Sequence, residues 1–210
     1  MKKILCFGDS NTYGYRPEDG GRYDETIRWT GRLQKKLGEG YEVIEEGLCG
    51  RTSIFEDDRV KGRKGIDSVE KIVKEQNPID VFVVMLGTND CKTKYHASAK
   101  EIADGLEQLI LKAKSKAPKE TKVLVISPIL LGKGVGEEGY DVEFNEDSEK
   151  VSLKLGEEYK KVAERNGYDF LNAADYAKPS ATDREHLNVQ GHEKLAEAIY
   201  QKIIEIQGIF

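Results

Sequence analysis

The stretch of sequence that decides the fold is Ile79-Asp80-Val81-Phe82-Val83-Val84-Met85-Leu86. It is nearly all apolar, as expected of a β-strand that is covered on both faces. Asn77-Pro78, immediately before it, ends a helical pattern, because proline cannot continue a helix. Gly87-Thr88-Asn89-Asp90, immediately after it, is polar and begins with glycine, as is typical of a loop. The stretch therefore predicts a buried strand of a parallel sheet.

Similar apolar runs alternate with helical patterns along the rest of the chain. Four further runs are typical of strands: Ile4–Phe7, Tyr41–Ile44, Val123–Ile126 and Tyr168–Leu171. Apolar residues repeat with the helical period over about 28–37, 66–76, 102–113, 146–165 and 189–206. Such alternation predicts a three-layer α/β/α fold with a five-stranded parallel, flavodoxin-like sheet. By analogy with that fold we expect the strand order 2-1-3-4-5, in one domain over residues 1–210.

The composition excludes several classes of protein. The formal net charge of the 210 residues is −5 and no basic block stands out, so we expect no nucleic-acid partner. No apolar run approaches the roughly 18 residues of a membrane span, so we expect no membrane partner either. No pair of cysteine or histidine residues has zinc-ligand spacing, and we therefore expect no metal.

Two features of the sequence favour a cytoplasmic protein. The apolar run Ile4–Phe7 is too short for the apolar core of a signal peptide. The three cysteines, Cys6, Cys49 and Cys91, are odd in number and widely spaced, so they outline no disulfide framework.

Two loops are expected where an open parallel sheet binds its ligands, beyond the carboxyl ends of the first and third strands. The first contains Gly8-Asp9-Ser10-Asn11, and its serine can present a hydroxyl at the sheet edge. On local grounds alone the favoured alternative is an ordinary turn, in which serine and aspartate bond nearby backbone. In the second loop, Asn89 carries an amide that can donate to a developing oxyanion, and the alternative is again a simple turn.

Two other segments offer the groups that a nucleophilic serine needs. Gly50, after the second strand, has an unobstructed backbone N–H of the kind that builds oxyanion holes, with a flexible turn as the alternative. Asp183 and His186 stand three positions apart, so the carboxylate can orient an imidazole that serves as base. A solvated surface pair is the common alternative. We interpret His96 and His192 as structural or solvent-facing residues.

These blocks together resemble the GDSL, or SGNH, hydrolase family. They occur in family order as Gly8-Asp9-Ser10, Gly50, Gly87-Thr88-Asn89-Asp90 and Asp183-x-x-His186. The resemblance implies that Ser10 is the nucleophile, that His186 is the base and that Asp183 orients it. It also implies an oxyanion hole formed by the N–H groups of Ser10 and Gly50 and the side chain of Asn89. The first block departs mildly from the family pattern, because Asn11 stands where the motif has leucine.

A closer likeness is to the arylesterase and acyltransferase branch of that family. It rests on Arg28-Trp29-Thr30-Gly31, Val43-Ile44-Glu45-Glu46-Gly47-Leu48, Gly50-Arg51-Thr52 and Met85-Leu86-Gly87-Thr88-Asn89-Asp90. The likeness implies a serine esterase whose substrates are small-molecule esters with acetyl or other short acyl groups. It further implies an acyl-enzyme on Ser10, acyltransferase side activity, no cofactor and assembly into homo-oligomers.

The sequence does not decide which residues bind the substrate or what one long segment does. Asn11, Tyr13 and Trp29 are candidate substrate-binding residues, with ordinary packing as the alternative. The segment Ser127–Asn145 is a candidate lid or oligomer contact, with a mobile solvent loop as the alternative.

Two other functions also stay open. One is a carbohydrate O-deacetylase of the same family. The other is a non-catalytic flavodoxin-like binding module that holds a phosphate or a flavin in the loop Ser10–Thr12. The binding module leaves Asn89, Asp183 and His186 without a role.

Overall fold

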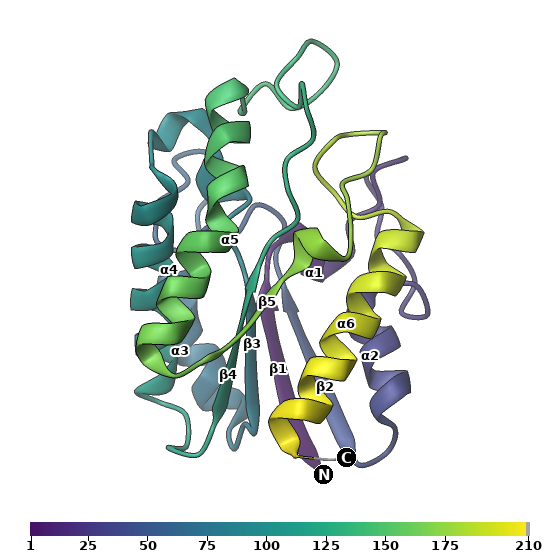
Figure 1. Ribbon diagram of the computed structural model, residues 1–210, viewed down its shortest axis with the longest axis vertical. Coiled ribbons are helices and arrows are strands. Elements are labelled where there is room, and N and C mark those ends of the chain that lie inside the picture. Colours follow the sequence, from purple (N-terminus) through teal and green to yellow (C-terminus); the bar gives the residue numbers. More distant parts are fainter. Residues whose placement is uncertain (209–210) are drawn as a thin grey trace.

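The computed structural model describes residues 1–208, in which five parallel strands form one sheet (Figure 1). The strands are β1 (Lys2–Gly8), β2 (Tyr41–Gly47), β3 (Val81–Met85), β4 (Lys122–Ser127) and β5 (Asp169–Asn172). Their order across the sheet is β2-β1-β3-β4-β5, so the predicted order is confirmed. The carboxyl ends of β1 and β3 therefore lie side by side, with the end of β2 next to β1.

Helices cover both faces of the sheet, as predicted. Those longer than one turn are α2 (Trp29–Leu37), α3 (Gly65–Gln76), α4 (Ala99–Lys114), α5 (Glu146–Asn166) and α6 (Val189–Gln207). Figure 1 shows α3, α4 and α5 on one side of the sheet and α2 and α6 on the other. Within residues 1–208, none of the helices combines the length and the apolar character that crossing a membrane requires.

The apolar run of β3 is buried along its whole length, which explains why it carries no polar alternation. Its side chains alternate between two hydrophobic clusters. Val81, Val83 and Met85 pack in the cluster that contains residues of α2 and α6. Phe82 and Val84 pack with residues of α3, α4 and α5. The central strand thus joins both helical layers to one sheet.

Among the differences from the sequence prediction, two concern segments next to the site. β2 continues from Ile44 to Gly47, although Glu45 and Glu46 are charged. β2 is an edge strand whose residues are all half-buried, so Glu45 can pair there with Arg28 at 2.8 Å. The second difference is a short helix, α1 (Ser10–Tyr13), directly after β1. A helix of one turn is too short for any hydrophobic period to reveal it.

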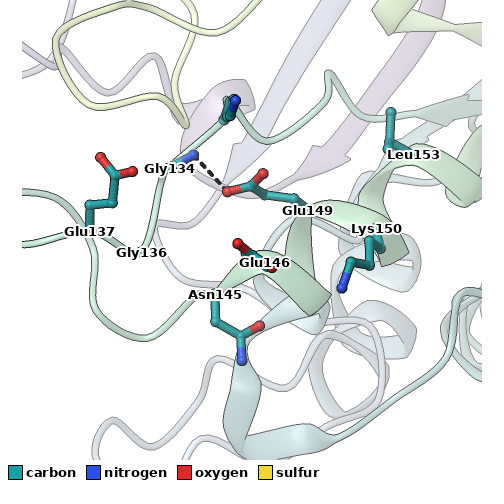
Figure 2. Close-up of a pocket in the computed structure, with 9 residues that line it drawn as sticks. Gly134, Gly136, Glu137, Asn145, Glu146, Glu149, Lys150 and Leu153 are labelled. Atoms are coloured by element: carbon teal, nitrogen blue, oxygen red, sulfur yellow. Dashed lines mark hydrogen bonds between the residues drawn. The ribbon is translucent and has the colours of Figure 1, made fainter.

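Residues between β4 and α5 do not form a free loop. Leu131, Val135 and Phe144 are buried, and all three belong to the hydrophobic cluster that contains residues of α5. The N–H of Gly134 donates a 2.6 Å hydrogen bond to the Glu149 carboxylate on α5, as Figure 2 shows. This segment, 128–145, is therefore anchored to the helix that follows it.

Candidate active site

Ser10, His186 and Asp183 form a hydrogen-bonded chain beyond the carboxyl end of β1. The Nε2 atom of His186 lies 2.8 Å from Ser10 Oγ, and its Nδ1 atom lies 2.7 Å from Asp183 Oδ2. The other oxygen of Asp183 accepts the backbone N–H groups of Glu185 and His186, which fixes the turn between acid and base. The structure thus brings together a hydroxyl, a base and an orienting carboxylate, which is the geometry of an activated nucleophile.

Local structure at Ser10 explains how its side chain is presented. Ser10 is the first residue of α1, and Asp9 caps this helix by accepting the N–H of Asn11 at 2.9 Å. α1 ends after one turn at Gly14, whose φ of 84° is left-handed. The chain therefore turns sharply after β1. This is the carboxyl end of the sheet, where open parallel sheets bind their ligands.

Asn11 connects the serine loop to the histidine loop. Its side-chain oxygen accepts the N–H of Leu187 at 2.9 Å, and its backbone carbonyl accepts the indole N–H of Trp29 at 3.1 Å. Asn11 and Trp29 are both buried, and neither lines the pocket that contains Ser10 and His186. Both pack behind the site in this structure, and their expected role in substrate binding stays a prediction.

Tyr13 is the third residue expected to bind substrate, and it does not line the pocket either. Its ring packs 4.4 Å from the guanidinium of Arg22. The aromatic residue that does line the pocket is Tyr15, whose ring centroid lies 4.3 Å from that of His186. Sequence patterns do not distinguish Tyr15 from Tyr13, because the two tyrosines stand only two positions apart.

The three predicted oxyanion donors lie at one pocket with Ser10 and His186. Gly50 and Asn89 both line it. Within residues 1–208, the backbone N–H groups of Ser10 and Gly50 donate to no protein acceptor. Asn89 uses its amide to donate to the carbonyl of Arg51 at 3.2 Å, which leaves its second N–H free. Gly50 has a φ of 78°, and an added Cβ would lie 2.4 Å from Arg63 Nε, so this position favours glycine.

Buried polar side chains that the sequence did not single out tie the loops of this site to one another. Arg51 donates to the carbonyl of Gly8 at 2.9 Å, and its guanidinium lies over the ring of Phe7. Asp90 accepts the backbone N–H of Ser53 at 2.8 Å and also its hydroxyl. These bonds join the loops after β1, β2 and β3, and they explain why those loops are polar although their residues are buried.

The pocket has a volume of about 610 Å³, within the usual range for sites that bind small molecules. The segment between β4 and α5 forms part of its wall with residues 139–143. This segment also contacts the catalytic loop, because the N–H of Gly132 donates to the carbonyl of Arg184 at 2.7 Å. The guanidinium of Arg184 in turn donates to the carbonyl of Gly134 at 2.8 Å. The long segment is thus a fixed wall of the pocket in this structure.

The charges around His186 favour its protonated form. Burial by itself lowers the pKa of His186, but the carboxylates of Glu185 and Asp183 outweigh it, and the pKa lies above its ordinary value of 6.5. Burial also raises the pKa of Asp183, but its hydrogen bond with His186 leads to a lowered pKa overall. An imidazolium formed during a reaction would therefore be stabilised by its surroundings.

His192 is buried and does not belong to this chain of groups. Its Nδ1 atom accepts the backbone N–H of Trp29 at 3.2 Å, where α6 packs beside α2. Burial lowers its pKa to about 3, so it stays neutral near neutral pH. Its interpretation as a structural residue agrees with this position.

A parallel sheet with a serine, a histidine and an aspartate hydrogen-bonded beyond its carboxyl edge is the arrangement of serine hydrolases. The sequence model of the GDSL-like lipase/acylhydrolase family matches residues 6–194. The chain belongs to this family, and it is a carboxylic ester hydrolase.

Three of the proteins that this chain resembles are named as esterases. The carbohydrate acetylesterase Est24 from Sinorhizobium meliloti is 30% identical, with a TM-score of 0.89 over 98% of this chain and 100% of the other. The aryl esterase of M. smegmatis is also 30% identical, with a TM-score of 0.89 over 98% and 99% of the two chains. An acetylxylan esterase from Xylanibacter ruminicola is 26% identical over 94% of this chain, which spans only 42% of that protein.

The electrostatics of His186 predict how activity depends on pH. We expect kcat/KM for a short-chain ester to fall as the pH drops through a midpoint above 6.5, because protonated His186 cannot accept the proton of Ser10. The measurement is the initial rate of ester hydrolysis at low substrate concentration between about pH 5 and 9. A midpoint below 6.5 would contradict the assigned environment of His186.

Proposed function

We propose that the protein hydrolyses esters of acetyl and other short acyl groups through a covalent acyl intermediate on Ser10. The observation that carries the proposal is the bond of 2.8 Å between Ser10 Oγ and His186 Nε2, with Asp183 on the other nitrogen of the ring. A serine hydroxyl is a weak nucleophile at neutral pH, and an adjacent base is what activates it.

Acylation uses the groups that face the pocket. His186 takes the proton of Ser10 as its oxygen attacks the carbonyl carbon of the ester. The negative charge that forms on the carbonyl oxygen is stabilised by the N–H groups of Ser10 and Gly50 and by the amide of Asn89. His186 then gives its proton to the leaving alcohol, and the acyl group stays on Ser10. Asp183 keeps Nδ1 protonated, so that Nε2 is the atom that accepts and returns the proton.

Deacylation repeats the same steps with water. His186 takes a proton from a water molecule that attacks the acyl carbon, and Ser10 recovers its proton when the acid leaves. An alcohol that enters in place of water would receive the acyl group instead, which is the acyltransferase side activity. In this series of steps, each proton is transferred by His186, and the charge that develops on the carbonyl oxygen is stabilised by the oxyanion donors.

Deacetylation of carbohydrates is the second candidate function. The pocket wall carries the charged side chains of Arg63, Lys92, Glu143 and Glu185. Such a wall suits a hydroxylated alcohol better than a long acyl chain, because charged groups are costly to cover with hydrocarbon. The similarity to a carbohydrate acetylesterase supports the same candidate.

Replacing Ser10 tests the proposed nucleophile. We expect Ser10→Ala to abolish hydrolysis of 4-nitrophenyl acetate above the uncatalysed rate, because within residues 1–208 no other hydroxyl lies within hydrogen-bonding distance of His186 Nε2. Ser115→Ala, at the end of α4 and outside the pocket, is the matched control and should keep the wild-type rate. Hydrolysis by Ser10→Ala at a rate close to that of the control would disprove the role of Ser10.

Replacing Asn89 tests the oxyanion hole. We expect Asn89→Ala to lower kcat by about 10²- to 10³-fold, with a smaller effect on KM. The reason is that the side-chain amide donates a hydrogen bond to the negative charge that develops in the transition state. Steady-state kinetics on the same ester separates the two constants. If kcat stays within a few-fold of the wild-type value, Asn89 is not an oxyanion donor.

A further inference from the structure

Glu185 is a buried acid beside His186, and the proposed steps of acylation and deacylation do not use it. Only 7% of its surface is exposed, yet it lines the same pocket as Ser10 and His186. Within residues 1–208, its carboxylate accepts no hydrogen bond, and its nearest charged neighbour is His186 Nε2 at 3.8 Å. That nitrogen already bonds Ser10. The carboxylate belongs to the pocket wall and receives no hydrogen bond from the protein, so a ligand in the pocket can supply a donor.

The other charged groups that line the pocket have partners. Arg63 pairs with Asp57 at 2.8 Å, and Lys92 pairs with Glu143 at 2.6 Å. Asp141 accepts the backbone N–H of Glu143, and Asp183 holds His186. Among the charged side chains of this wall in the described part of the chain, Glu185 is thus the one that makes no hydrogen bond within the protein.

The position of Glu185 indicates which part of a substrate it meets. The carbonyl oxygen of an ester must face Gly50 and Asn89, whereas the leaving oxygen must lie within hydrogen-bonding distance of His186 Nε2, which protonates it. Glu185 Oε1 lies 3.8 Å from that nitrogen. A hydroxyl on the carbon next to the esterified one is therefore within reach of the Glu185 carboxylate.

We propose that Glu185 is a specificity-determining residue, which binds a free hydroxyl on the carbon next to the esterified one. The substrates it favours are then monoesters of vicinal diols and polyols, a class that includes partly acylated sugars. The inference rests on the proposed function, because it places the leaving oxygen by the proton that His186 donates. The inference also explains how the site would select the alcohol part of the ester. The catalytic groups alone do not provide that selection.

The electrostatics of the pocket agree with this role. Burial raises the pKa of Glu185, while His186 and Lys92 act in the opposite direction. A hydroxyl can donate to the Glu185 carboxylate, whereas an ether oxygen in the same place can only accept and therefore cannot bind it. A site built to bond a hydroxyl rejects the analogue that lacks it more strongly than an apolar site does, because its own polar group is then left unpaired.

A matched pair of esters tests the proposal. The two substrates are 2-hydroxyethyl acetate and 2-methoxyethyl acetate, which share the acyl group and differ in whether the neighbouring oxygen can donate. We expect the wild-type protein to have a higher kcat/KM for the hydroxyl ester. Glu185→Leu should lower the ratio of the two kcat/KM values by about 10- to 100-fold, as expected for the loss of a hydrogen bond to a charged group. Release of acetic acid, followed by titration at constant pH, measures both substrates in the same way.

Two further variants separate recognition from a general effect of charge. Glu185→Gln has the same size and keeps an acceptor oxygen, so it should fold as the wild type does and keep part of the preference. Asp141→Asn removes a different acid from the pocket wall and should leave the ratio unchanged.

Three outcomes would overturn the proposal. The first is a wild-type protein that hydrolyses both esters equally well. The second is a Glu185→Leu variant that slows both esters by the same factor, since Glu185 would then act only through the charge of His186. Either result leaves the proposed esterase function intact. The third is hydrolysis that Ser10→Ala retains, which would instead remove the proposed function on which the inference rests.

Discussion

The hydrogen bond between the Leu187 N–H and the side-chain oxygen of Asn11 is the contact on which the site depends. It joins the first loop of the sheet to the last segment before α6, and both partners are buried. Ser10 and His186 directly adjoin these two residues in sequence, so the 2.8 Å contact between base and hydroxyl follows from it. A bond of this kind is stronger in a buried site than in water, and breaking it would leave a buried donor unpaired. The nucleophile and its base are thus positioned by the scaffold beneath them as well as by each other.

Three buried acids, Asp9, Asp90 and Glu185, belong to the loops of this site. Burial raises the pKa of Asp9 to about 7 and that of Asp90 to about 6, and Glu185 is raised as well. Asp9 caps the turn that carries Ser10, while Asp90 holds Ser53 and so fixes the loop after β2. These two acids organise the backbone, whereas Glu185 faces the pocket. Some polar residues of these loops therefore stabilise the backbone, whereas Glu185 is available to bind a ligand.

Local patterns in the sequence predicted most of the fold. The apolar run of β3, the helical period of α4 and the glycine that ends α5 each act within one element, and the structure confirms them. The extension of β2 was missed because Glu45 is paired across space with Arg28, which no pattern within the strand can show. The packing of Asn11 and Trp29 behind the pocket could not be predicted for the same reason, since their partners Leu187 and His192 lie far away in sequence. Glu185 stood beside His186 in the sequence, but only its burial and its missing donor distinguish it from a surface acid.

Covalent labelling tests the account most directly. The protein is treated with an alkyl fluorophosphonate, which forms a stable bond to an activated serine, and the labelled residue is located by mass spectrometry of the digested protein. The account predicts one label, on Ser10, and a loss of ester hydrolysis in proportion to the fraction labelled. Complete inactivation without a label on Ser10, or full activity when Ser10 is labelled, would contradict it.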